Sequence, residues 1–244
     1  MRIKITLNVL PGTIIDVNYQ YHLASFVYKT LSKQDNEGGK FLHDLGYSFS
    51  DNDNRRYKFF TFSNLNISRF KLDRRDLIIN CDTISFIFST IKDEIAIRFM
   101  NGVLKQKTVL SKNITLRDVE IIPEPDFNSG MILKAISPIF ITKSDLHLGP
   151  NDQYYNEAIS INLSSKKTVL SGERRDLNEL NIIPIGHIKE KCITIREGKE
   201  GECKNKCFTY TFKVEGDPEL IEIGYKCGFG KGNAMGFGCV EEVK

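Results

Sequence analysis

The order of strand and helix patterns along the chain constrains its fold more than any other feature. In residues 2–9, Ile3, Ile5 and Leu7 alternate with polar residues, which is typical of a half-buried strand. Later segments alternate between strand-like and helix-like spacing of their apolar residues. We place these segments at residues 19–34 (helix), 57–63, 65–71, 77–81 and 84–90 (strands), 93–106 (helix) and 115–122 (strand). The resulting order is β-α-β-β-α-β with extra strands between the two helices, and it predicts a ferredoxin-like domain.

A connector from Pro123 to Gly130 separates this set of elements from a second one. The second set has a strand at 131–142, a weaker helix at 151–164, strands near 181–196 and 208–214, a helix after Asp217-Pro218 and a last strand in FGCVEEV. Asp217-Pro218 is a typical helix start, with a capping side chain followed by proline. We therefore predict an α+β chain of two tandem ferredoxin-like (RRM-like, βαββαβ) domains, with ranges 1–125 and 126–244.

The composition is that of a globular protein with room for a sizeable core. The 244 residues are 41% hydrophobic and 27% charged, and no apolar run reaches the roughly 18 residues that a membrane helix needs. The first residues, MRIKITLNVL, do not resemble a signal peptide. We expect a cytoplasmic protein without membrane association, whose six cysteines are reduced thiols. The C-x₃-C spacing of Cys203 and Cys207 does not fit a structural zinc site, so we expect no metal and no cofactor.

Positive charge is concentrated in one short window. The net charge of +3 says little about a nucleic-acid partner. Between residues 55 and 75, however, Asp73 is the one acidic residue among seven basic ones: Arg55, Arg56, Lys58, Arg69, Lys71, Arg74 and Arg75. Such a window is typical of a solvated surface, and also of a surface that neutralises phosphates.

Residues 228–238, GFGKGNAMGFG, form a glycine-rich segment near the C-terminus. They do not fit a dinucleotide-binding motif, because Asn233 stands where the third glycine is needed and the segment follows a helix. The main-chain N–H groups of such a segment can bind phosphate, and Lys226 and Lys231 add positive charge. The alternative is a tight turn that packs the last strand.

This segment, with a hydrophobic residue between paired glycines at each end, resembles the C-terminal loop of the CRISPR-associated repeat-processing endoribonucleases of the RAMP superfamily. NYQYHLASFVYKTL, FLHD, YKFFTFS, MNGVL and ISPIFIT are similar to further segments of that family, so the resemblance covers most of the chain. It implies metal-independent cleavage of CRISPR repeat RNA (pre-crRNA) by 2′-hydroxyl attack, which leaves a 2′,3′-cyclic phosphate and a 5′-hydroxyl. It also implies delivery of the guide RNA to a CRISPR interference complex, and it leaves monomer and homodimer open.

The resemblance further implies which residues carry out the cleavage. His43, in FLHD, corresponds to the family's catalytic histidine, and an unperturbed pKa of about 6.5 suits proton transfer near neutral pH. Tyr28 matches a tyrosine that orients the proton-transfer group or the scissile phosphate. Lys58 matches a lysine that holds charge on the phosphorane. His22 is a second candidate histidine.

The polar insert SFSDNDNRR precedes Lys58, so Lys40, Arg55 and Arg56 are alternatives for its role. We expect RNA to contact the basic residues near Lys58 and the glycine-rich segment, with Arg174-Arg175 as a further candidate. The expected contacts are Arg55, Arg56, Lys226, Gly228, Gly230, Lys231, Gly232, Asn233, Gly236 and Gly238. Two other interpretations stay open: a repeat-RNA-binding subunit that does not cleave, and an unrelated ferredoxin-like regulatory domain, which leaves the glycines unexplained.

Overall fold

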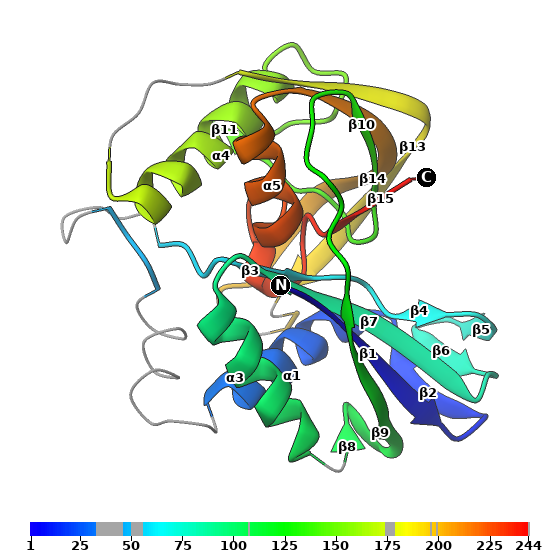
Figure 1. The fold of residues 1–244 in the computed structure, drawn as a ribbon. Helices are drawn as coiled ribbons and strands as arrows, with labels where there is room; N and C mark the ends of the chain where they lie inside the picture. The colour runs from blue at the N-terminus through cyan, green and yellow to red at the C-terminus, as the bar shows by residue number, and fades with distance from the viewer. Residues whose placement is uncertain are drawn as a thin grey trace.

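The computed structural model describes residues 1–32, 46–49, 56–106, 108–173, 179–195, 197–198 and 200–243. Several residues singled out in the sequence lie outside this part of the chain: Lys40, His43, Arg55, Arg174 and Arg175. The described chain forms two α+β domains, each with an antiparallel sheet and two long helices (Figure 1). No helix of the described residues is both long and apolar enough to cross a membrane.

The first domain is built around its first strand. Its elements are β1 (Arg2–Val9), β2 (Thr13–Asp16), α1 (Tyr19–Ser32), β3 (Phe60–Phe62), β4 (Asn66–Ile67), β5 (Phe70–Asp73), β6 (Asp76–Ile79), β7 (Thr83–Thr90), α3 (Asp93–Leu104), β8 (Thr108–Val109) and β9 (Ser111–Ile122). The main sheet has the order β3-β7-β1-β9-β8, and β2, β6 and β5 form a separate small sheet. Ile3, Ile5 and Leu7 are fully buried in one core with α1 and α3, as the alternation in the sequence predicts.

The second domain repeats this arrangement. Its elements are β10 (Met131–Ala135), β11 (Thr142–Lys143), β12 (Leu146–His147), α4 (Tyr155–Ser171), β13 (Leu180–Ile195), β14 (Cys203–Gly216), α5 (Pro218–Cys227), the 3₁₀ turn η2 (Asn233–Met235) and β15 (Val240–Glu242). Its sheet order, β13-β14-β10-β15, matches β3-β7-β1-β9 of the first domain strand for strand. The predicted fold class, two tandem ferredoxin-like domains, is confirmed.

Helix α4 differs most from its predicted range. It begins and ends later than residues 151–164, and Gly172, at φ 73°, ends it in the left-handed conformation. Lys166 and Lys167 are both buried, so they interrupt the apolar stripe by which a helix is recognised in sequence. The predicted start of α5 is confirmed, because the Asp217 side chain accepts a hydrogen bond from the Glu219 N–H.

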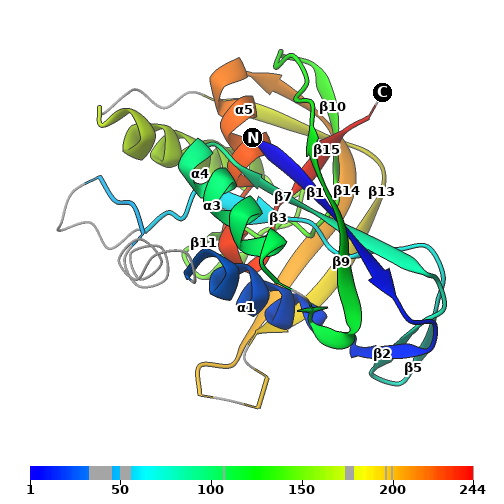
Figure 2. The same cartoon turned by 60° about the horizontal axis from the view of Figure 1, so that its bottom comes forward.

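The glycine-rich segment lies at the junction of the two domains. Thr61 of β3 donates a hydrogen bond to the Phe237 carbonyl at 2.9 Å, and Gln20 of α1 donates one to the Gly236 carbonyl. A second junction is formed by the hairpin of β13 and β14, which extends past α1 (Figure 2). There Asn18 donates a hydrogen bond to Glu197 at 2.7 Å. The glycine-rich segment and this hairpin therefore both join the two domains, in addition to the connector.

Candidate nucleic-acid interface

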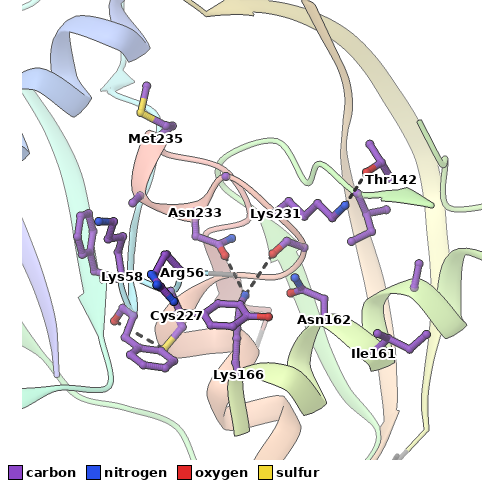
Figure 3. Close-up of a pocket in the computed structure, with 18 of the residues that line it drawn as sticks. Arg56, Lys58, Thr142, Ile161, Asn162, Lys166, Cys227, Lys231, Asn233 and Met235 are labelled. Carbon is purple, nitrogen blue, oxygen red and sulfur yellow. Dashed lines mark hydrogen bonds between the residues drawn. The ribbon is translucent and has the colours of Figure 1, made fainter. Parts of the chain in front are cut away.

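A cleft of about 550 Å³ lies between the two domains. One wall is the stretch from Arg56 to Phe60 that leads into β3 (Figure 3). The opposite wall consists of residues 141–144 and one face of α4, on which Ala158, Asn162 and Lys166 follow each other at helical spacing. Residues 230–235 of the glycine-rich segment complete the cleft. We call this site the first cleft.

The lining of the first cleft has one sign of charge. Its described lining residues include five basic side chains and no aspartate or glutamate; the basic ones are Arg56, Lys58, Lys143, Lys166 and Lys231. A cleft lined by cations between walls of low dielectric concentrates positive potential. The first cleft therefore favours an anionic ligand, and the phosphate backbone of a nucleic acid is such a ligand.

The glycine-rich segment needs its glycines for close packing. A Cβ atom on Gly230, at φ 76°, would collide with the carbonyl of Phe140. One on Gly238, at φ 74°, would collide with the carbonyl of Phe229. Both glycines also have left-handed backbone angles, which side chains disfavour. The segment is thus a compact loop. It packs the last strand, as the alternative interpretation predicts, and it also lines the first cleft.

Lys166 of α4 supports this loop from below. Its ammonium donates hydrogen bonds to Oδ1 of Asn233 at 2.8 Å and to the carbonyl of Gly230 at 3.2 Å (Figure 3). It also donates one to the carbonyl of Gly228 at 2.6 Å. The Asn233 amide in turn donates to the carbonyl of Phe237 at 3.0 Å. Burial lowers the pKa of Lys166 to about 8, an effect that nearby Cys227 partly opposes.

Lys58 lies in the first cleft, next to the chain that follows His43 in sequence. It is half-buried, and its Nζ would lie 3.1 Å from a Cβ atom on Gly46, the third residue after His43. The backbones of Tyr47 and Tyr57 exchange two hydrogen bonds, at 2.7 and 2.8 Å. This bridge fixes residues 46–47 beside the stretch that carries Lys58 and leads into β3.

Tyr28 lies beneath the wall of the first cleft rather than in its lining. Its ring packs edge-on against Phe60, with 5.7 Å between the centroids. Burial raises the pKa of Tyr28 to about 12, so the hydroxyl stays protonated at neutral pH. Tyr28 is therefore suited to donate a hydrogen bond and not to accept a proton.

The other residues predicted to bind RNA are divided by the structure. Arg56 and Lys231 line the first cleft, together with Gly230, Gly232 and Asn233. Lys231 donates a hydrogen bond to the Thr142 hydroxyl at 2.6 Å. Lys226 is not in the lining: it pairs with Glu124 at 2.8 Å and Glu222 at 2.7 Å. Gly228, Gly236 and Gly238 lie in the inner part of the loop, packed against protein.

His22 lies in a second cleft of about 450 Å³, where the tip of the β13–β14 hairpin meets the first domain. This second cleft is lined by Asp16, Asn18, Tyr21, His22, Arg75, Thr194, Glu197 and Gly198. Arg75 donates two hydrogen bonds to the Glu197 carboxylate, at 2.7 and 2.6 Å. His22 itself is exposed and does not line the first cleft.

The contribution of the second domain to the first cleft was not predicted from the sequence. Lys143, Asn162 and Lys166 were not singled out, although the last two share one helix face with Ala158. The spacing of four residues places Ala158, Asn162 and Lys166 on one face of a helix. It predicts a cleft wall only when the packing of α4 against the glycine-rich loop is already known. Among the described residues there is no group of three or more histidine, cysteine, aspartate or glutamate residues that could hold a metal ion.

Both halves of the chain match models of one protein family. Residues 14–120 match the model described as CRISPR-associated protein Cas6, N-terminal, and residues 122–242 match CRISPR associated protein Cas6, C-terminal. The chain is 32% identical to CRISPR-associated endoribonuclease Cas6 1 of Methanocaldococcus jannaschii over 257 residues, which cover 100% of this chain and 93% of that protein. It is 23% identical to CRISPR-associated endoribonuclease Cas6 of Pyrococcus furiosus over 240 residues, with 93% and 83% covered. A solved structure described as CRISPR associated protein Cas6 superposes with a TM-score of 0.78 at 30% identity, covering 100% of this chain and 99% of that one.

Proposed function

The chain belongs to the Cas6 family of CRISPR-associated endoribonucleases, and from this premise we propose that it cuts CRISPR repeat RNA in the first cleft. The resemblance drawn from its sequence is thereby confirmed. The observation that carries the proposal is the lining of this cleft, with five basic side chains and no acidic one among the described residues. Residues 1–125 would supply the catalytic groups and residues 126–244 the loop that holds the RNA.

The proposed reaction uses the RNA's own nucleophile. The 2′-oxygen attacks the neighbouring phosphorus as its proton is removed, and the bond from phosphorus to the 5′-oxygen breaks as that oxygen gains a proton. The products are a 2′,3′-cyclic phosphate and a 5′-hydroxyl. Three contributions are needed: a proton acceptor, a proton donor and positive charge on the phosphorane. The reaction requires no metal, as the resemblance implies.

Three residues would supply these contributions. His43 would transfer protons, because imidazole exchanges them near neutral pH. Lys58 would hold charge on the phosphorane, and its place in the first cleft beside Gly46 supports this role. Tyr28, whose hydroxyl burial keeps protonated, packs against Phe60 and would help to orient the proton-transfer group from behind this wall.

The RNA backbone would lie along the cations and the glycine-rich loop. Arg56, Lys231 and the backbone at Gly230 and Gly232 are the contacts that the cleft supports best. The charge of Lys226 is neutralised by Glu124 and Glu222, so we place the contacts on the other residues. The RNA contact at Arg55 stays a prediction. The cytoplasmic location, the interference complex as a partner and the choice between monomer and homodimer also stay predictions.

The test is cleavage of a labelled repeat RNA in excess EDTA, beside the same RNA with a single 2′-deoxy residue at the cut site. We expect one discrete product from the first RNA and none from the second. Product from the deoxy RNA would contradict 2′-hydroxyl chemistry. Tight binding with no product over many hours would favour the non-cleaving RNA-binding subunit.

A further inference from the structure

Lys166 is a buried cation whose partners are all neutral. Lys166 is 2% exposed, less than any other cation that lines the first cleft. The three oxygens that accept its hydrogen bonds are two carbonyls and one amide oxygen. Among the described residues, no ion pair joins Lys166 to a carboxylate. A buried charge is normally paired with an opposite one, because removing it from water is costly.

The surroundings of Lys166 do not supply the missing negative charge. Lys167, its neighbour on α4, has its own carboxylate partners, at 2.8 Å (Asp217) and 2.6 Å (Glu219). Cys227 of α5 is a neutral thiol at pH 8, because burial raises its pKa to about 11. The remaining charged groups around the first cleft are cations: Lys231 of the loop, Lys143 of β11, and Arg56 and Lys58 of the first domain. Lys143 forms an ion pair with Glu157 of α4 at 2.6 Å.

The hydrogen bonds of Lys166 determine the shape of the loop. The oxygens of Gly228, Gly230 and Asn233 all point toward one ammonium, and Asn233 then braces the carbonyls of Phe229 and Phe237. Loss of the ammonium would leave three oxygens unpaired at a buried position, which is costly. The loop can therefore keep its conformation only while a donor occupies this place.

We propose that Lys166 is a positioning residue for the RNA: it holds the glycine-rich loop in its RNA-binding shape, and an RNA phosphate at the loop is the counter-ion that the folded protein lacks. The inference rests on the proposed function, because its ligand is the repeat RNA. One consequence separates it from a purely structural role. An anion near the ammonium favours the charged form and raises the pKa of Lys166 above 8, so RNA binding at pH 8 to 9 draws a proton onto this residue.

The test is calorimetry of RNA binding in buffers of different ionisation enthalpy, which gives the number of protons taken up. The RNA carries the 2′-deoxy residue, and the protein carries His43→Ala, so that neither cleavage nor the proposed catalytic histidine contributes. In this background we expect net proton uptake that is largest between pH 8 and 9. Lys166→Arg, which keeps its charge at these pH values, should remove that uptake while it retains binding. Lys166→Met should remove the uptake and weaken binding at least about tenfold.

Lys167→Met is the matched control, because it removes a buried lysine from the same helix but from a different set of partners. It should leave proton uptake and affinity unchanged. Circular dichroism establishes whether each variant is folded. If Lys166→Met does not fold, the pH dependence of proton uptake in the protein that retains Lys166 still tests the inference. Absence of uptake between pH 7 and 9.5, or equal uptake with Lys166→Arg, would overturn the inference. Cleavage of the unmodified repeat by protein with His43 intact would show that the proposed function stands independently of this inference.

Discussion

The first and second clefts carry cations from the same basic window, residues 55–75, but differ in what surrounds those cations. In the first cleft, Arg56 and Lys58 are joined by further lysines, and no described lining residue is acidic. In the second cleft, Arg75 lies within hydrogen-bond distance of Glu197 and 3.9 Å from Asp16. A run of basic residues in sequence is therefore not one surface. Arg75 is paired with a carboxylate, whereas Arg56 and Lys58 line a cleft that has no aspartate or glutamate among its described lining residues.

The comparison also separates a ligand site from a contact between domains. The ion pair of Arg75 with Glu197 joins the tip of the β13–β14 hairpin to the first domain. Both side chains are exposed, and exposed pairs contribute little to stability because water and salt screen them. The first cleft instead holds a buried cation, Lys166, whose partners are neutral. We therefore expect substitutions in the first cleft to change cleavage or RNA binding, and substitutions in the second cleft to have at most a small effect on stability.

The largest expected difference concerns the two histidines. His43→Ala should lower the single-turnover cleavage rate by roughly 10²–10⁴, the usual contribution of a general acid or base. RNA affinity should change little, because the group acts mainly in the transition state. His22→Ala, in the second cleft, is the control and should cut at the wild-type rate. The reverse result would move the catalytic site to the second cleft.

The next largest effect is expected at Lys58. Lys58→Ala should lower the rate by about 10², as removal of a group that stabilises transition-state charge does in other enzymes. Lys58→Arg should recover part of the rate, because it restores the charge but not the geometry. Rates are measured in single-turnover experiments at saturating enzyme. An unchanged rate with Lys58→Ala would transfer its role to another cation, with Arg56 tested first.

A smaller effect is expected on binding at Lys231. Lys231→Ala should weaken RNA binding several-fold for any sequence and lower the slope of log affinity against log salt by about 1, if it contacts one phosphate. Arg75→Ala should leave this slope unchanged, because its charge is already paired. Filter binding with uncleavable RNA between 50 mM and 400 mM salt measures both. Equal slopes for wild type and Lys231→Ala would exclude a phosphate contact at Lys231.

The smallest effect concerns stability at the second cleft. Glu197→Gln should lower the thermal unfolding midpoint slightly at low salt, and the difference from wild type should vanish in 1 M salt, where exposed charges are screened. Cleavage should be unaffected. A large loss of cleavage with Glu197→Gln would mean that the hairpin contact controls the reaction and would remove the contrast between the two clefts.

The element order was predictable because its signals are local. Alternation in β1, helical spacing in α1 and α3, and the Asp217-Pro218 start of α5 each depend on a few neighbouring residues. The contact between Lys166 and Gly228 was not predictable, because it joins residues 62 apart through the packing of the whole second domain. Lys166 and Lys167 interrupt the apolar stripe of α4, so the predicted helix ended at residue 164 and not at Ser171. Catalytic roles came from family resemblance, and His43 lies outside the described residues.

The most direct test of the central claim, that the RNA occupies the first cleft, is photocrosslinking of an uncleavable repeat RNA with 4-thiouridine beside the cut site, followed by mass spectrometry of the adducts. The account predicts adducts on residues that line the first cleft, with Tyr57 and Met235 as the most reactive of its half-buried side chains. Adducts on Tyr21 or His22, with none in the first cleft, would contradict it.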